Sequence, residues 1–255
     1  MASSEMVFDV PRPDPGAAMR VFCFPFAGGG SATYHGWLDQ LHPQAELVTV
    51  QMPARGTRLA DAPCDNMAEL VDSLFAHIAP LLDKPYVFFG HSMGSKVAFE
   101  LASRLHRDGL PLPLHFIASA SPAPFLPRAE APIHALPDAQ FIARLASLNG
   151  TPQRILQSRE LMALLMPAMR ADFKLLANYV GHAGTVLPTT LTLCGGSHDD
   201  ALEHDDMLAW RRVFAGAGEL HIFDGGHFYL NEHGAALVAL INRLIEAAVL
   251  AELPS

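Results

Sequence analysis

Short runs of apolar residues alternate along the chain with longer stretches in which apolar positions recur every three or four residues. The short runs are apolar at nearly every position, as expected for parallel strands that helices cover on both faces. This repeated alternation predicts an α/β fold with a mostly parallel, doubly wound sheet. We expect strands at residues 20–26, 46–52, 86–90, 114–120, 189–195 and 219–225.

The longer stretches predict the helices that cover the sheet. Helical spacing is clear over residues 67–81 and 97–105. The last apolar stretch, 234–253, is interrupted by Asn242, Arg243 and Glu246. It therefore predicts an amphipathic closing helix, too short and too polar to span a bilayer.

The regular alternation stops between residues 121 and 185. The segment opens with SPAPFLPRAEAP, whose prolines predict irregular structure. Helices inserted after the fourth strand suggest a lid over the carboxyl edge of the sheet, and crossover helices packed in the core are the alternative. We expect one domain over residues 1–255, with the insertion at about 121–185. The expected helices start at Pro137, cover 158–166, and follow Pro167 with Met169, Phe173, Leu176 and Val180 on one face.

Composition narrows the class of protein. With 255 residues, 50% hydrophobic and 17% charged, the chain can bury one sizeable core. Its net charge of −9 argues against a nucleic-acid partner, which requires a basic face. The N-terminus lacks a signal-peptide pattern, and the three cysteines, Cys23, Cys64 and Cys194, show no CxxC spacing. We expect a reduced, cytoplasmic, monomeric protein that does not bind membranes.

The clearest chemical motif is Gly90-His91-Ser92-Met93-Gly94, which fits G-x-S-x-G between a predicted strand and a predicted helix. A turn this tight strains the serine backbone and projects its hydroxyl above the sheet edge. Side chains at the two flanking positions would collide with the neighbouring strand and helix, so glycine is required there. The sequence therefore predicts Ser92 as a nucleophile.

A serine nucleophile needs a base and an orienting acid, and in this fold they follow it in the chain as acid and then histidine. His227 follows the last predicted strand, and Asp199 and Asp200 follow the strand before it. Carboxyl ends of parallel strands meet at one edge, so these side chains can gather. We predict His227 as the base, a core or surface histidine being the alternative. We favour Asp199 as the acid and keep Asp200 as the alternative.

The tetrahedral oxyanion needs two backbone donors. We predict the backbone amide of Met93, the residue directly after the nucleophile, as the first donor. The second should come from the loop after the first strand, where Ala27 leads the run Gly28-Gly29-Gly30. A phosphate cradle is the alternative for these glycines, but the G-x-G-x-x-G spacing and the P-loop Lys-Ser/Thr are absent.

Two further features could have a function: a cluster of histidines and aspartates, and a lysine shortly after Ser92. The stretch SHDDALEHDD gathers histidines and aspartates, and we interpret it as a solvated polar loop because its spacing fits no metal motif. We expect no metal and no cofactor. Lys96 lies in the first turn of the helix after Ser92, where the helix dipole disfavours a cation. We therefore expect its side chain to reach into solvent, a role in holding a partner being the alternative.

Taken together, these segments resemble the type II thioesterases, discrete α/β-hydrolases that accompany nonribosomal peptide and polyketide synthases. The resemblance runs over nearly the whole chain. Arg170-Ala171-Asp172-Phe173 and the Met-Pro-x-Arg-Gly step at 52–56 make it specific. The segments that carry it are FCFPFAGGGSATYHGW, VQMPARGTRL, FFGHSMGSKVAFELA, LPDAQFIARLASLNGTP, MPAMRADFKLLANY, GGSHDDALEHDDMLAW and FDGGHFYL.

The resemblance implies roles for individual residues. It implies Ser92 as nucleophile, His227 as base, and the Ala27 and Met93 amides as the oxyanion hole. The family carries its acid in a Gly-x-x-Asp step, which Gly196-Ser197-His198-Asp199 fits, and this favours Asp199 further.

The implied reaction is hydrolysis of acyl or aminoacyl thioesters on the phosphopantetheine arm of carrier protein domains, an editing role. Phe26 and the loop after strand four depart from the family pattern, which leaves substrate preference open. The methionines 162, 166 and 169 suit either a forgiving acyl pocket or simple core packing. A carboxylesterase or acyltransferase on the same fold is the alternative function, and a non-catalytic acyl-binding or docking protein is a second.

Overall fold

The computed structural model describes residues 7–127, 132–200, 202–216 and 218–251. Within these residues, seven strands form one sheet in the order β1-β3-β2-β4-β5-β6-β7. Neighbouring strands from β3 to β7 are parallel, and β1 pairs antiparallel with β3 at the edge. The strands are β1 (Phe8–Asp9), β2 (Met19–Phe24), β3 (Ala45–Val50), β4 (Tyr86–His91), β5 (His115–Ser119), β6 (Thr190–Gly196) and β7 (Glu219–Phe223).

All six strands predicted from the sequence are present, and the α/β class with a mostly parallel sheet is confirmed. Their ends differ from the predicted ends by at most two residues. The strand β2 stops at Phe24 because Pro25 has no N–H to continue a ladder. The short β1 escaped prediction because two residues carry no periodicity.

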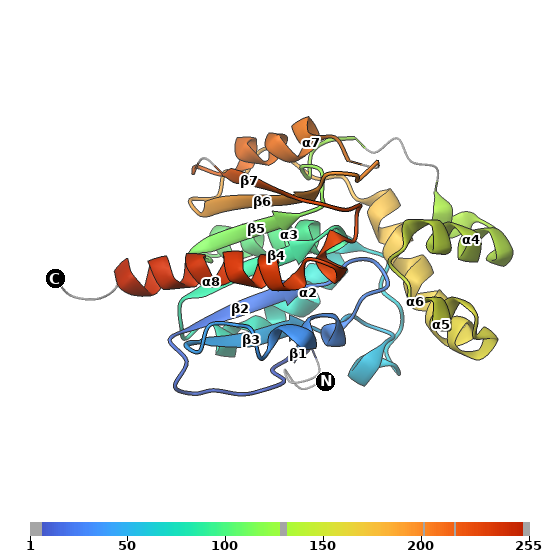
Figure 1. Cartoon of the computed structure of the whole chain (residues 1–255), viewed down its shortest axis with the longest axis horizontal. Coiled ribbons are helices and arrows are strands. Elements are labelled where there is room, and N and C mark those ends of the chain that lie inside the picture. Colours follow the sequence, from blue (N-terminus) through green and yellow to red (C-terminus); the bar gives the residue numbers. More distant parts are fainter. Residues whose placement is uncertain (1–6, 128–131, 201, 217, 252–255) are drawn as a thin grey trace.

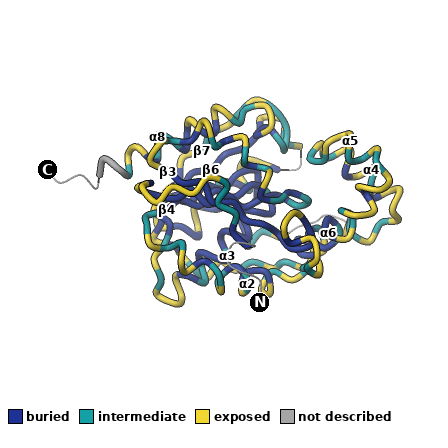
Figure 2. The backbone as a smooth tube through the Cα atoms, turned by 90° about the horizontal axis from the view of Figure 1, so that it is seen from below, coloured by how far each residue is buried: buried dark blue, intermediate teal, exposed yellow. Residues whose placement is uncertain are grey.

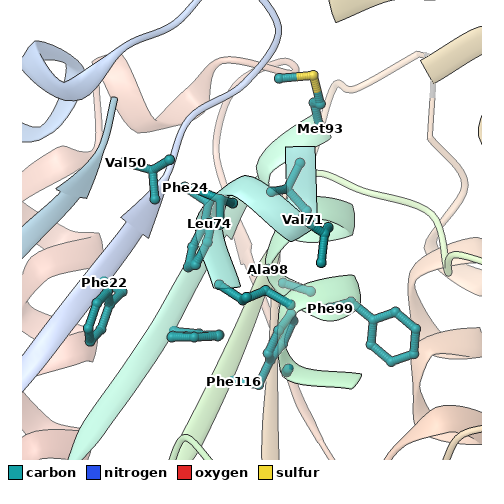
Figure 3. Close-up of a cluster of buried hydrophobic side chains, with 14 of the residues drawn as sticks. Phe22, Phe24, Val50, Val71, Leu74, Met93, Ala98, Phe99 and Phe116 are labelled. Carbon is teal, nitrogen blue, oxygen red and sulfur yellow. The ribbon is translucent and has the colours of Figure 1, made fainter. Parts of the chain in front are cut away.

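Two apolar layers cover the two faces of the sheet. Two consecutive residues of β4 show the division: Phe88 packs into the cluster on one face and Phe89 into the cluster on the other. Helices α2 and α3 cover the Phe88 face, whose core Figure 3 shows, and α8 crosses the opposite face (Figure 1). These helices are α2 (Met67–Ile78), α3 (Met93–Arg107) and α8 (Gly234–Ala251); the short α7 (His204–Leu208) follows β6.

Three helices follow β5 and lie together beyond one end of the sheet (Figure 1). The helices are α4 (Asp138–Leu148), α5 (Gln153–Leu156) and α6 (Arg159–Asn178). They form an apolar cluster of their own around Phe141, Leu145, Met162 and Met169, while their outer surfaces are exposed (Figure 2). Only the second half of α6 reaches the main core, through Leu175 and Leu176. The segment before them, described over 121–127, is irregular as predicted; 128–131 lie outside the described residues.

The prediction of two separate helices on either side of Pro167 is wrong, because α6 runs through this proline. Proline removes one backbone donor from a helix interior and normally ends or kinks the helix. Here residues on both sides of Pro167, Met162 and Met169, pack into the same cluster, and this tertiary burial outweighs the local cost. Val180 was also misplaced: it lies after the helix and is 76% exposed.

The closing helix is confirmed as α8, with Leu237 and Ile241 buried in the sheet face it covers. Across the described ranges, no helix combines the length and hydropathy that crossing a membrane requires.

Candidate active site

Ser92 lies in the turn between β4 and α3 with φ 53° and ψ −114°, a conformation that residues other than glycine rarely adopt. Two backbone hydrogen bonds hold it there. The Ser92 amide donates to the Ser119 carbonyl at 2.7 Å, and the Ser92 carbonyl accepts from the Ser95 amide at 3.1 Å. The strain at Ser92 is thus held by the end of β5 and the first turn of α3.

The two glycines of the motif are required by contact distances. A Cβ on Gly90 would lie 2.5 Å from the Gly94 carbonyl oxygen, and a Cβ on Gly94 would lie 2.0 Å from the Phe24 carbonyl oxygen. Neither distance leaves room for a methyl group, and in both cases the obstacle is backbone. The prediction that neighbouring strand and helix exclude side chains here is confirmed.

The structure brings Ser92, His227 and Asp199 together from the ends of β4, β7 and β6. His227 Nε2 lies 2.9 Å from Ser92 Oγ, and His227 Nδ1 lies 2.7 Å from Asp199 Oδ2. The Asp199 carboxylate accepts from Nδ1–H, which leaves Nε2 to accept from the serine hydroxyl. Asp199 has a side chain only 3% exposed, whereas Asp200 is exposed and His227 contacts Asp199 instead.

Close backbone contacts hold the acid and histidine loops against each other. The amides of Ser197 and His198 donate to the carbonyls of Phe223 and Gly225, each at 2.8 Å. A Cβ on Gly196 would lie 2.3 Å from the Gly226 carbonyl oxygen, so the two loops meet without an intervening side chain. The loop bends just before His227 at Gly225, which has φ 124°.

The two predicted oxyanion donors flank the serine. Met93 begins α3, where the helix dipole favours negative charge, and Ala27 lines the same cavity as Ser92. In the described part of the chain, neither the Met93 nor the Ala27 amide donates a hydrogen bond. Both amides can therefore donate to a bound oxyanion.

Beneath the site, His91 is fully buried and was not singled out by sequence reasoning. Its Nδ1 lies 2.8 Å from Ser119 Oγ, which in turn lies 2.6 Å from the Tyr229 hydroxyl. Burial, together with the nearby charge of His227, lowers the pKa of the His91 imidazole well below its ordinary value. A neutral His91 adds no positive charge beside His227, whose ring is centred 5.5 Å away.

A second feature that sequence reasoning did not identify is the pairing of Arg55 with Asp172. Both belong to segments that contributed only to the family resemblance. Arg55 Nη1 and Nη2 donate to Asp172 Oδ2 and Oδ1 at 2.6 and 2.7 Å, and both side chains are buried. Their separation of 117 positions in the chain hides this contact from any local pattern.

The cavity at Ser92 is small, about 70 Å³, and Phe26, Phe173 and Phe228 contribute to its walls. A larger polar cavity of about 600 Å³ adjoins it and shares His227, Phe228 and Arg144. Met162 and Met166 line a different cavity, enclosed by α4, α5 and α6, and Met169 packs in the cluster of those helices. Met162 and Met169 are buried in that cluster, whereas Met166 is half-buried at the wall of a cavity separate from the one at Ser92.

The prediction for Lys96 is wrong. Its side chain is 2% exposed, and its ammonium group donates to the Pro122 carbonyl at 3.1 Å and lies 5.6 Å from the centre of the Tyr179 ring. These tertiary contacts outweigh the unfavourable helix dipole. The polar stretch 197–206, which ends in the first turn of α7, shows no group of three or more metal-ligating side chains within its described positions.

Comparisons with known proteins place these observations in context. A family model described as "Thioesterase domain" matches residues 19–246. Gramicidin S biosynthesis protein GrsT of Aneurinibacillus migulanus is 36% identical over 216 residues, covering 85% of this chain and 84% of that protein. Thioesterase PikA5 of Streptomyces venezuelae is 34% identical over 222 residues, covering 87% and 79%. The structure of the type II thioesterase BorB from the borrelidin biosynthetic cluster matches with TM-score 0.87 and 32% identity, covering 95% and 99%.

We expect Gly94→Ala to destabilise the protein strongly, because the added methyl group would meet the Phe24 carbonyl at 2.0 Å. Overpacking of this kind costs about 1–3 kcal/mol or more. The matched control is Gly36→Ala, where an added Cβ has no neighbour within 4 Å. Urea unfolding of both variants measures the difference. Equal unfolding midpoints for the two variants would contradict the steric argument.

We expect His91 to make stability depend on pH. Its pKa is lower in the folded protein than the ordinary value of 6.5, so below that pH the unfolded chain binds a proton that the folded protein does not. The contribution of His91 to the free energy of unfolding therefore falls as the pH drops below about 6.5. His91→Asn, which cannot titrate, should show a shallower fall in urea unfolding over this range. Identical slopes would show that His91 is not held neutral.

Proposed function

The chain belongs to the thioesterase family and is a type II thioesterase, and on that premise we propose that Ser92, His227 and Asp199 hydrolyse thioesters on carrier proteins. The resemblance drawn from sequence motifs is confirmed by the family match and by relatives of 32–36% identity over most of the chain. The observation that carries the proposal is the continuous hydrogen-bonded set from Asp199 through His227 to Ser92.

The proposed chemistry has two stages. Ser92 Oγ attacks the thioester carbonyl carbon while His227 Nε2 takes the hydroxyl proton, and the Ala27 and Met93 amides donate to the oxyanion. The carbon–sulfur bond then breaks, and His227 returns the proton to the leaving thiol. In the second stage His227 deprotonates a water molecule, which attacks the acyl-enzyme, releasing a carboxylic acid and free Ser92. Asp199 holds the His227 ring and stabilises its charged form throughout.

The substrate we propose is an acyl or aminoacyl group on the phosphopantetheine arm of an acyl or peptidyl carrier protein, and the role is editing of stalled carriers. The small volume of the cavity over Ser92 favours short acyl groups over long acyl chains as substrates. We also propose that α4, α5 and α6 act as a lid within one domain. Their own apolar cluster and their position beyond the sheet end support this (Figure 1). The three free cysteines, Cys23, Cys64 and Cys194, support a cytoplasmic location, where thiols stay reduced.

The first test is mass spectrometry of a carrier domain charged with an acetyl, a longer acyl or an aminoacyl group. The intact protein should remove the acetyl group fastest, and Ser92→Ala should hydrolyse at least about 10³-fold more slowly, since the nucleophile is absent. Near-normal turnover by Ser92→Ala would contradict the mechanism. No hydrolysis by a protein that still reacts with a serine-directed probe would favour a carboxylesterase or acyltransferase instead.

Two neighbouring aspartates provide a matched test of the acid. Asp199→Asn should lower kcat by about 10³–10⁴-fold, because the amide no longer stabilises the charged His227 ring or fixes its tautomer. Asp200→Asn, one position along and exposed, should stay within about twofold of the parent. Steady-state hydrolysis of a carrier-bound thioester compares them. Loss of activity in the Asp200 variant alone would transfer the role to that residue.

A further inference from the structure

The buried pair Arg55–Asp172 joins three segments that are distant in the chain. Asp172 lies on α6, in the insertion after β5, and Arg55 lies in the loop after β3. The third segment is the loop after β2: the Gly28 amide donates to Asp172 Oδ2 at 2.7 Å, and Arg55 Nη1 donates to the Gly29 carbonyl at 2.9 Å. Arg55 Nε also donates to the Pro53 carbonyl at 3.1 Å, which fixes the guanidinium plane.

These contacts hold Gly28 and Gly29, the two residues that follow Ala27 in the loop. The peptide unit before Ala27 is fixed by a turn in which the Phe26 carbonyl accepts from the Gly29 amide at 2.8 Å. In a planar trans peptide the carbonyl and the N–H point in opposite directions, so this bond aims the Ala27 N–H away from the turn. The peptide unit after Ala27 is fixed by Asp172, which accepts from Gly28. Both sides of Ala27 are therefore held.

Asp172 ties this loop to α6 at Gly28. Gly28 has φ 85°, and α6 packs against it: a Cβ there would lie 3.5 Å from the Met169 side chain. Asp172 Oδ2 accepts from both Gly28 N and Arg55 Nη1, so one oxygen links the loop to the guanidinium. The Asp172 side chain is 1% exposed, and water does not compete for these bonds.

We propose that Asp172 and Arg55 are positioning residues for the oxyanion hole, through which α6 holds the Ala27 amide in place for the transition state. The inference rests on the proposed function, in which Ala27 donates to the oxyanion. An amide that binds only the developing oxyanion raises kcat and leaves KM nearly unchanged. A pair that served only to hold the fold would lower the fraction of active enzyme, and with it kcat, but would leave the affinity of the folded enzyme for an oxyanion mimic unchanged.

The main test variant is Arg55→Met combined with Asp172→Leu, which replaces the pair with apolar side chains of similar size. Such replacements of buried pairs often leave stability unchanged, but here the Gly28 amide loses its acceptor. Asp172→Asn, which keeps the shape and one carbonyl oxygen, is the second variant. The matched control is Asp138→Asn. It breaks the ion pair between Asp138 on α4 and Arg170 on α6, whose charged atoms lie 2.7 Å apart. This pair does not touch the loop after β2.

Two measurements are made on each variant. The first is kcat and KM for a carrier-bound acetyl thioester. The second is the affinity for an alkyl trifluoromethyl ketone, which forms a tetrahedral adduct on a serine nucleophile and so reports oxyanion binding. The double variant should lose about 10²-fold in kcat and a similar factor in ketone affinity, with KM within about threefold. Asp172→Asn should lose about tenfold in both, and the Asp138 control should match the parent.

A folded double variant with kcat and ketone affinity near those of the parent would overturn the inference, as would a fall in kcat with unchanged ketone affinity. If the double variant does not fold, the same two outcomes in Asp172→Asn decide the question. Failure of the proposed function itself looks different. In that case Ser92→Ala would keep hydrolysing the thioester or would still form the ketone adduct, whatever the Asp172 variants do.

Discussion

The contact between the start of α3 and the end of β2 is the constraint on which the site depends. Gly94 lies so close to the Phe24 and Pro25 carbonyls that no side chain fits between them. This contact brings the first turn of α3, with the Met93 amide, against the loop that carries Ala27. This close approach of two backbones therefore lets the turn that presents Ser92 lie beside the loop that carries Ala27.

The remaining groups gather because parallel strands end at a common edge. The loops after β6 and β7 are tied to each other by backbone hydrogen bonds, and they deliver Asp199 and His227 to the serine from positions far along the chain. The insertion after β5 is fastened to this edge by Asp172, whose carboxylate contacts the Ala27 loop through Gly28. The helices beyond the sheet and this edge of the sheet thus share a buried ionic contact, not only an apolar surface.

Local patterns in the sequence were sufficient for the six longer strands, for the turn around Ser92, and for the chain order that paired His227 with an aspartate. They failed where tertiary contacts override local preference. Pro167 lies inside a helix because residues on both sides of it share one apolar cluster, and Lys96 is buried because Pro122 and Tyr179 offer it partners. The Arg55–Asp172 pair and the neutral His91 had no local signal, since each depends on residues that only the fold brings together.

The central claim is that Ser92 becomes acylated during hydrolysis, and trapping that intermediate tests it most directly. An aryl thioester has a good leaving group, so acylation should outpace deacylation when the reaction is quenched within its first turnover. Mass spectrometry of the digested protein should then find the acyl group on the peptide that contains Ser92, formed before free acid appears. Acid released at the full rate with no acyl group on Ser92, or with the acyl group on another residue, would contradict the account.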